Sequence, residues 1–307
     1  MRLRNGLYLC LGALIWGTAF VAQSEGNHYM GPVTFQAARS VLAVLFLLPL
    51  VLVRKHARDR RIAEGDRNVP VYSRSKLLLG GLCTGAFLTA ASTLQQIGLV
   101  GTDVGKSGFL TDLYIVLVPV LAFFLTGKSS LRIWISVLIA ALGLYFLCFG
   151  GSVEIGRYDL ILILCAFFFA CQITCVDYFC RFCDGVELSL MQFVTTTVIS
   201  VILSFMFEKP EIGGILEGWF PLFYAGILSS GVAYTLQIVG QKGQDPTVAS
   251  LIMSLESVIS VISGWLILHQ SFSLREFLGC VLVFAAVLLS QIPLPQKNIR
   301  TQKTSME

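Results

Sequence analysis

The sequence is poor in charged residues. Asp, Glu, Lys and Arg make up only 13% of its 307 residues, whereas 55% are hydrophobic, and the mean hydropathy is +0.78. A chain with so little polar surface cannot form a soluble globular protein. The longest polar stretch is the segment 54–76, so we expect no separate soluble domain.

Residues suited to hydrolytic chemistry are also scarce. The three histidines lie near expected loops, and the sequence contains no G-x-S-x-G or H-E-x-x-H motif. Residues 101–107, GTDVGKS, have one residue too few between their glycines for a phosphate-binding loop, and no strand precedes them. We therefore expect no enzyme, no cofactor and no nucleic-acid partner.

Four of the nine cysteines are close together in the sequence: Cys171, Cys175, Cys180 and Cys183. Their spacings of four and three are compatible with thiolates on one helical face that hold a soft metal ion. No histidine lies nearby, and cysteine also packs as a small apolar residue. We favour packing and expect no metal site.

Apolar segments near the roughly 20 residues needed to cross a bilayer dominate the chain. They cover residues 5–23, 32–53, 76–99, 104–125, 131–150, 158–178, 188–207, 218–239, 246–268 and 274–292. Backbone amides in hydrocarbon must be satisfied within the segment, and the alternation of a membrane barrel is missing, so the segments are expected to be helices. The predicted fold is an all-α membrane protein with ten transmembrane helices.

The basic residues predict the orientation of these spans. With the amino terminus inside, 17 of the 22 Lys and Arg residues fall on the cytoplasmic side, eight of them in the loop 54–76. We interpret that loop as a topology determinant, with an anionic-lipid patch as the alternative. Both termini are predicted to be cytoplasmic. The first span resembles a signal peptide but lacks a cleavage site, so we expect it to be retained.

A stretch of sequence occurs twice. A shift of 142 residues superimposes 93–113 on 235–255 with seven identities in 21 positions, including Gln95 on Gln237 and Asp103 on Asp245. We expect a first repeat in 1–150, a second in 151–293 and a cytoplasmic tail in 294–307. Five spans per repeat, an odd number, invert the second repeat in the membrane, which is typical of secondary transporters with a site between the halves.

Polar side chains within the spans are the candidates for that site, because a charge at a helix centre costs about 2.5 to 3.5 kcal/mol. Asp112 and Glu256 are each expected about 14 Å deep. Arg39 suits a substrate carboxylate, but a salt bridge to Asp103, Asp112 or Glu25 is an equal alternative. Lys106 is expected at the outer interface. The candidate substrate-binding or coupling residues are Trp16, Arg39, Gln95, Asp112, Tyr114, Gln172, Gln237 and Glu256.

Each of the remaining candidates has a structural alternative. The three glutamines either contact a ligand or join helices, and Trp16 either lines a cavity or packs. Pro119 is expected to kink the fourth span just beyond Asp112. Gly226 and Gly231 are expected to permit close helix approach or bending of the eighth span.

Several short motifs resemble the EamA repeat of the drug/metabolite transporter superfamily. Residues 13–18, ALIWGT, with Phe20 and Val21, then Pro32 and 35–39, resemble the opening of a repeat, and 254–256, SLE, followed by 264–266, GWL, resemble the ninth span. The resemblance covers about residues 5–292. The sequence departs from the pattern at Ser257, at Gly127 and Lys128, and at His269 and Gln270, where the family often has Pro or Gly-Glu pairs.

The resemblance implies a bacterial inner-membrane carrier that exports amino acids or related small metabolites. We expect alternating access, a small-molecule substrate between the repeats, and proton exchange at Asp112 or Glu256. Drug-like cations, nucleosides or sugar conjugates are alternative substrates, and a membrane-embedded enzyme or scaffold is an alternative class. A homodimer and the coupling ion stay open.

Overall fold

The described part of the protein is mostly helical. The computed structural model describes residues 2–66, 70, 72–127, 130–148, 156–269 and 273–291, and within these residues it contains no strand. The elements are α1 (Arg2–Gly26), α2 (Pro32–Ala63), α3 (Arg74–Gly98), α4 (Val104–Asp112), α5 (Tyr114–Thr126), α6 (Leu131–Cys148), α7 (Arg157–Phe179), α8 (Gly185–Phe207), α9 (Ile212–Glu217), α10 (Trp219–Phe223), the π-helix η1 (Tyr224–Ala233), α11 (Tyr234–Gln241), α12 (Pro246–Met253), α13 (Leu255–Leu268) and α14 (Leu274–Gln291).

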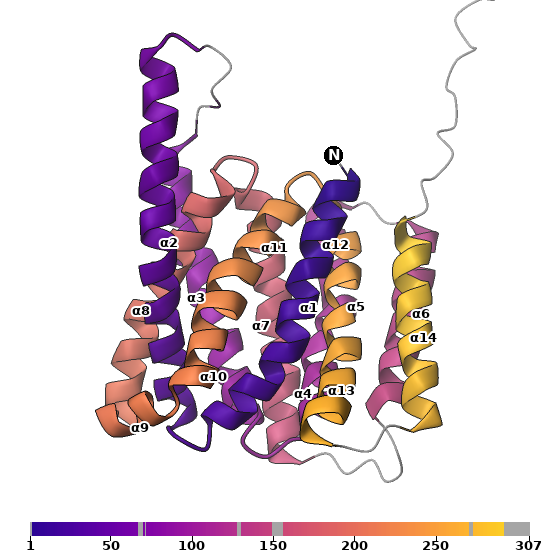
Figure 1. Cartoon of the computed structure of the whole chain (residues 1–307). Coiled ribbons are helices and arrows are strands. Elements are labelled where there is room, and N and C mark those ends of the chain that lie inside the picture. Colours follow the sequence, from indigo (N-terminus) through magenta and orange to yellow (C-terminus); the bar gives the residue numbers. More distant parts are fainter. Residues whose placement is uncertain are drawn as a thin grey trace, which may run out of the picture.

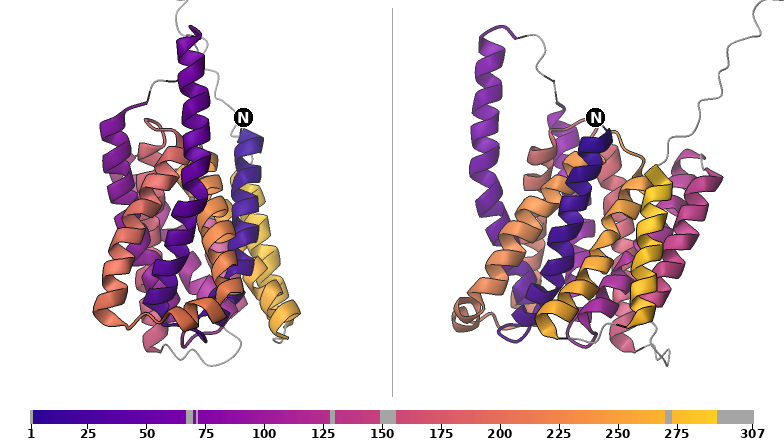
Figure 2. Two further views of the ribbon diagram at one scale, coloured as in Figure 1. Left: turned by 60° about the vertical axis from the view of Figure 1, so that its left-hand side comes forward. Right: turned by 45° about the vertical axis from the view of Figure 1, so that its right-hand side comes forward.

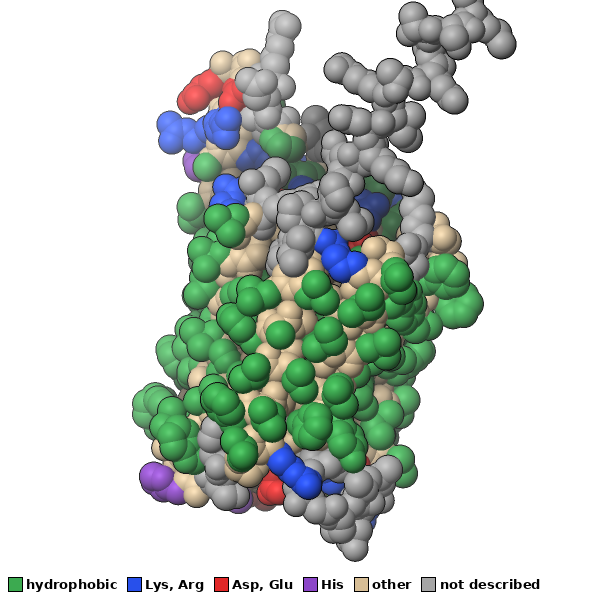
Figure 3. Space-filling model, turned by 90° about the vertical axis from the view of Figure 1, so that its right-hand side faces the viewer, with side chains coloured by type: hydrophobic (Ala, Val, Ile, Leu, Met, Phe, Trp, Pro, Cys, Tyr) green, Lys and Arg blue, Asp and Glu red, His purple; other side chains and the backbone are tan. Residues whose placement is uncertain are grey.

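The helices lie side by side and run between two ends of the molecule, called upper and lower here as they appear in Figure 1. Eight segments of the described chain are long and apolar enough to cross a membrane, and two shorter apolar helices cover Leu131–Phe146 and Phe277–Ser290. Hydrophobic side chains cover the middle of the face in Figure 3, and charged ones gather near its ends. The surface therefore suits a bilayer.

Helix α2 is longer than expected. The sequence indicated a loop from residue 54, but the helix continues to Ala63 and rises above the other helices (Figures 1 and 2). Arg, Lys and Ala are good helix formers, which explains the extension. Two ion pairs also fasten it to the start of α8: Arg54 to Asp184 at 3.3 Å and Arg58 to Glu187 at 2.7 Å. Residues 67–69 and 71 of the expected loop, and the expected tail 294–307, lie outside the described residues.

Helix ends follow the local sequence. Pro246 occupies the first turn of α12, and the Asp245 carboxylate accepts hydrogen bonds from the backbone N–H groups of Thr247 and Val248, at 2.8 and 3.3 Å. Two spans are interrupted helices: α4 continues into α5, and α12 continues into α13. Their last helices, α5 and α13, end at Gly127 and His269, which both adopt left-handed backbone conformations, with φ of 65° and 52°. These two residues are equivalent under the 142-residue shift. The repeats therefore end their interrupted helices in the same way.

The two halves of the chain share one core. Helix α1 packs against α11 and α13, and α7 packs against α3 and α5. The first helix of each half therefore packs against helices of the other half. Helix α2 packs against α8, and α6 against α14. Figure 1 shows that α1 descends from the upper end whereas α7 ascends from the lower end. The contacts around the centre therefore come from both repeats.

Glycines allow α13 to approach its neighbours closely. A Cβ atom added to Gly17 of α1 would meet the Glu256 carbonyl at 2.6 Å, and one added to Gly108 of α4 would meet the Ser260 hydroxyl at 2.5 Å. Both distances are shorter than van der Waals contact. At Gly17 the clash is with backbone, so that crossing requires glycine, whereas at Gly108 the Ser260 hydroxyl would have to turn away. The crossings place α13, and with it Glu256, between α1 and α4.

We predict that Gly17→Ala destabilises the protein by about 1 to 3 kcal/mol, because the new methyl group must push α13 away from α1. Gly12→Ala, in the same helix, is the matched control. Its Cβ would lie 3.5 Å from the Ala233 carbonyl, an ordinary contact, so we expect a change within about 1 kcal/mol. Thermal unfolding in detergent measures both, and equal midpoints for the two variants would contradict the close approach.

Candidate functional site

A narrow cavity lies among helices from both halves. It is lined by Trp16, Phe20, Gln23, Arg39, Gln95, Tyr114, Phe169, Ile173, Ser229, Tyr234, Gln237, Met253 and Glu256. The volume that water molecules can occupy in it is about 30 Å³, which is room for about two waters. A metabolite therefore fits only after side chains turn or the halves move apart.

Two interrupted helices flank the cavity. The span that contains α4 and α5 is interrupted at Leu113, and the span that contains α12 and α13 is interrupted at Ser254. These positions agree within one residue under the 142-residue shift. In the second half, the Ser254 hydroxyl donates to the Leu251 carbonyl at 2.8 Å, a local bond that bends helices. In the first half, the break lies just beyond Asp112, where a kink was expected, although Pro119 itself lies inside α5.

The guanidinium of Arg39 is buried at the cavity wall. The residue is 1% exposed, and its Nη1 donates to the Gln23 side-chain oxygen at 2.6 Å. Its Nε has no hydrogen-bond partner, and the Tyr234 phenol lies within interaction range. Among the described residues Arg39 forms no salt bridge, so the alternative of a structural pair with Asp103, Asp112 or Glu25 is wrong. A buried cation with only neutral partners is costly, and an anion bound beside it would lower that cost.

The two carboxyl groups of the spans lie side by side. Asp112 is fully buried, and its Oδ2 accepts a hydrogen bond from the Ser257 hydroxyl of the other half. Its carboxyl group also interacts with Glu256 and with the Tyr114 phenol. Glu256 lines the cavity, whereas Asp112 lies behind it. The arrangement is a carboxyl pair of which one member faces the cavity.

A chain of amides leads from the cavity into the second half. Gln237 donates to the Gln172 side-chain oxygen at 3.1 Å, and Gln172 donates to Gln192 at 2.9 Å. Gln172 is fully buried outside the lining, so its amide joins α7, α8 and α11. The Gln237 oxygen has no hydrogen-bond partner, although it is buried. Its repeat mate Gln95 also lines the cavity and donates to Thr111 at 3.4 Å.

An aromatic wall faces these polar groups. Trp16 lines the cavity, its Nε1 donates to the Ser229 carbonyl at 3.3 Å, and its ring meets that of Tyr234 edge to face, with centroids 4.7 Å apart. Ser229 belongs to η1, and π-helical segments in α-helices are frequent at functional sites. Gly226 and Gly231 let α2 approach η1 closely, since a Cβ atom added to either glycine would lie 2.7 Å from a side chain of α2.

The sequence matches the EamA-like transporter family over residues 4–149 and again over 156–291. The chain belongs to the EamA-like transporter family. It is thus a multi-pass membrane transporter of the drug/metabolite type, as the short motifs implied.

Relatives of this EamA transporter extend across bacteria, archaea and plants. An uncharacterized transporter of Archaeoglobus fulgidus is 26% identical over 94% of this chain and 86% of its own length. The uncharacterized transporter YoaV of Bacillus subtilis is 21% identical over 93% and 96%. A chloroplastic WAT1-related protein of Arabidopsis thaliana is 24% identical over 91% and 67%. A crystal structure 17% identical, with a TM-score of 0.74 over 95% of this chain and 97% of the other, shares the fold.

Of the residues singled out in the sequence, six line the transporter cavity: Trp16, Arg39, Gln95, Tyr114, Gln237 and Glu256. Asp112 and Gln172 contact this set from behind. Gln23 and Tyr234 were missed, although both touch Arg39. A polar residue within an apolar span was the available signal for Gln23. The four clustered cysteines are free, and Cys180 and Cys183 belong to an apolar cluster with Phe179 and Leu188.

We predict that Ser257→Ala lowers the stability of the transporter by about 1 to 3 kcal/mol, because it leaves a buried carboxyl oxygen without its hydroxyl donor. Ser254→Ala is the control, since that hydroxyl bonds only within its own helix and its loss is expected to change stability by less than about 1 kcal/mol. Thermal unfolding of purified protein in detergent compares them. The contact between the halves would be unimportant if both variants unfolded at the parental temperature.

Proposed function

We propose that this transporter exports amino acids or closely related zwitterions across a bacterial inner membrane by alternating access. The observation that carries the proposal is the buried Arg39 guanidinium, which faces the cavity with an unpartnered Nε. A substrate carboxylate would complete its hydrogen bonds with the fork geometry that Arg favours. Glu256 and the free oxygen of Gln237 are acceptors for a substrate ammonium group. The cavity thus offers both signs of charge.

We infer ten spans in two inverted five-helix repeats, with both termini cytoplasmic. Eight long and two shorter apolar helices support this count. The opposite directions of α1 and α7 in Figure 1 support the inversion. The basic extension of α2, which carries Arg54 and Arg58, supports a cytoplasmic upper end. The lower end then faces outward.

Drug-like cations are the second candidate substrate. Trp16, Phe20, Tyr114, Phe169 and Tyr234 give the cavity an aromatic wall beside Glu256, which suits a cation. Arg39 in the same cavity repels a substrate that lacks an anionic group. The two candidates therefore predict opposite effects when the positive charge of Arg39 is removed.

We predict that Arg39→Gln reduces amino-acid export at least about tenfold, because a charge-assisted carboxylate bond is lost. Mass spectrometry of cells and medium, with and without overexpressed transporter, identifies the exported metabolites and measures the loss. Arg39→Lys should retain part of the flux. Arg54→Gln, on the exposed part of the same helix, is the control at matched membrane abundance. Unchanged amino-acid export by Arg39→Gln would reject the proposal, and improved export of cations would favour the second candidate.

We further propose that Asp112 and Glu256 share the coupling proton. Two adjacent buried carboxyl groups cannot both carry a charge, so one proton stays on the pair until substrate or water reaches it. Glu256 faces the cavity and would release the proton as a substrate ammonium group binds. Asp112, held by Ser257, keeps the pair in place.

Replacement of Glu256 by Gln is expected to abolish proton-driven flux in proteoliposomes, because the amide carries no exchangeable charge. Exchange of labelled for unlabelled substrate should continue in the same vesicles, which shows that the variant still folds and binds. Glu25→Gln, at an exposed position near the lower end of α1, is the control. A flux through Glu256→Gln that still followed the imposed pH gradient would exclude this pair as the coupling group.

A further inference from the structure

A second polar hollow lies at the lower end of the bundle. It is formed around the α3–α4 connection and the start of α7, and it is lined by Ser24, Leu99, Val100, Gly101, Thr102, Asp103, Val104, Lys106, Gly156, Tyr158 and Asp159. About 500 Å³ is open to the centres of water-sized molecules, far more than in the central cavity. We call it the lower basin. Five residues of the segment 101–107 line it: Gly101, Thr102, Asp103, Val104 and Lys106.

An apolar plug separates the lower basin from the central cavity. Phe20, Val21, Leu99 and Val104 form one buried cluster, each at most 8% exposed. Phe20 lines the central cavity, whereas Leu99 and Val104 line the lower basin. Gln23 and Ser24, adjacent in α1, divide between the two spaces in the same way. The cluster therefore has members at the wall of each space.

An ion pair lies on the basin side of this plug. Lys106 of α4 bonds Asp159 of α7 at 2.7 Å, with side chains 30% and 6% exposed. Asp159 also accepts hydrogen bonds from the Gly156 backbone at 2.8 Å and from Thr102 at 3.3 Å. The pair thus joins α4 of the first half to α7 of the second, and the Thr102 bond adds a contact from the α3–α4 connection. It must break, or move as a unit, for α4 to separate from α7.

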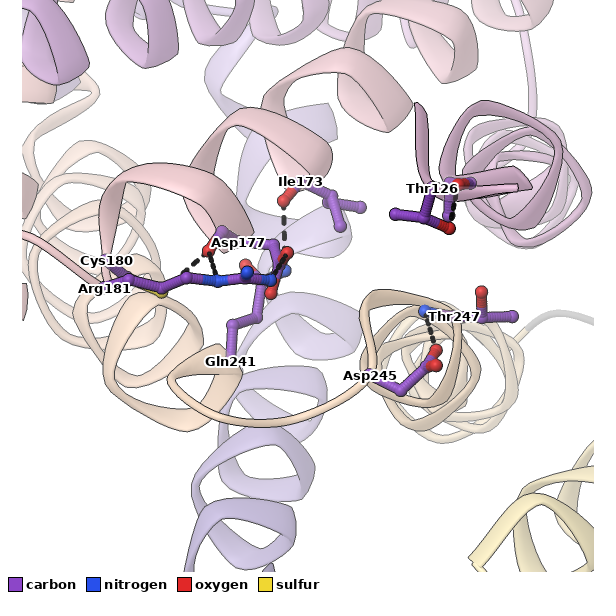
Figure 4. Close-up of polar contacts among 9 residues, drawn as sticks. Thr126, Ile173, Asp177, Cys180, Arg181, Gln241, Asp245 and Thr247 are labelled. Carbon is purple, nitrogen blue, oxygen red and sulfur yellow. Dashed lines mark hydrogen bonds and ion pairs between the residues drawn. The ribbon is translucent and has the colours of Figure 1, made fainter. Parts of the chain in front are cut away.

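The equivalent position at the upper end is built differently. The repeat mate of Leu99 is Gln241, whose Nε2 donates to the carbonyl of Ile173, a cavity-lining residue, at 3.2 Å (Figure 4). Nearby, Asn5 donates to the Lys242 carbonyl at 2.8 Å. At the position equivalent to Leu99, the upper end therefore has a hydrogen-bonded amide, where the lower end has an apolar side chain. The two ends therefore differ in chemistry at equivalent positions of the repeats.

We propose that the lower basin is the exit vestibule of the transporter, and that the Phe20–Leu99–Val104 plug with the Lys106–Asp159 pair forms the gate between it and the central cavity. This proposal rests on the transport function proposed above. A zwitterion leaving the cavity replaces the ion pair with its own two charges, its carboxylate toward Lys106 and its ammonium toward Asp159. The vestibule is thus a second, transient site for the same class of substrate.

Access of a thiol reagent to the cavity tests the gate without any knowledge of the substrate. Ser229→Cys places a reporter thiol on the cavity wall, and the Ser229 parent gives the background from native cysteines. A membrane-impermeant maleimide is added to right-side-out and to inside-out vesicles. With Lys106→Gln we expect the reporter to react about fivefold faster, and with Phe20→Ala about tenfold faster or more. The increase should occur only in the orientation that exposes the lower end.

Two further variants make the result specific. Lys106→Arg keeps the charge and should keep the slow reaction. Arg181→Gln breaks an ion pair with Asp177 that joins residues four apart at the end of α7. This variant should leave the rate unchanged. Equal labelling of all variants, or faster labelling from both sides, would overturn the gate. Labelling measures access to the cavity and not transport. The gate can therefore be tested even if the Arg39 experiment rejects amino-acid export.

Discussion

Hydrocarbon offers no hydrogen bonds, and this constraint explains where the polar side chains of the chain lie. Each buried polar group must find partners on a neighbouring helix or face an internal space. Gln172 bonds Gln192 and Gln237, Asp112 bonds Ser257, and Arg39 bonds Gln23. Four atoms of this set lack partners. Arg39 Nε and Gln237 Oε1 belong to residues that line the cavity, whereas Asp112 Oδ1 and Gln192 Nε2 belong to residues behind it. The cavity therefore keeps one donor and one acceptor that a ligand can use.

The two repeats have similar helices but different side chains at equivalent positions. Gln95 and Gln237 are mates and both line the cavity, whereas the mate of Glu256 is Tyr114 and the mate of Asp112 is Ser254. Each interrupted helix therefore presents a different group at the same place. One wall of the cavity carries a phenol and the other a carboxyl. The upper and lower ends differ in the same sense, because Leu99 faces the lower basin where the second half has Gln241.

Much of this arrangement is readable from the sequence, and the remainder depends on helix rotation. Apolar length predicts the spans, and the repeat predicts that Gln95, Gln237 and the Glu256 region meet, since equivalent segments surround one site. Buried glutamines look alike in sequence, so the lining Gln237 cannot be told from the supporting Gln172. Tyr234 and Gln23 were missed because their side-chain direction follows from packing against Arg39. The extension of α2 was missed because charge and helix propensity favour different interpretations of residues 54–63.

The bond between Asp112 and Ser257 has a consequence for biosynthesis. The carboxyl group belongs to a segment that the ribosome finishes some 145 residues before it makes the hydroxyl that satisfies it. Until α13 inserts, the first half holds a costly carboxyl group at the depth of the acyl chains with its partner not yet translated. Until then, the carboxyl group must be protonated, hydrated or held beside the insertion machinery. Assembly of the two halves is in this sense obligatory and ordered in time.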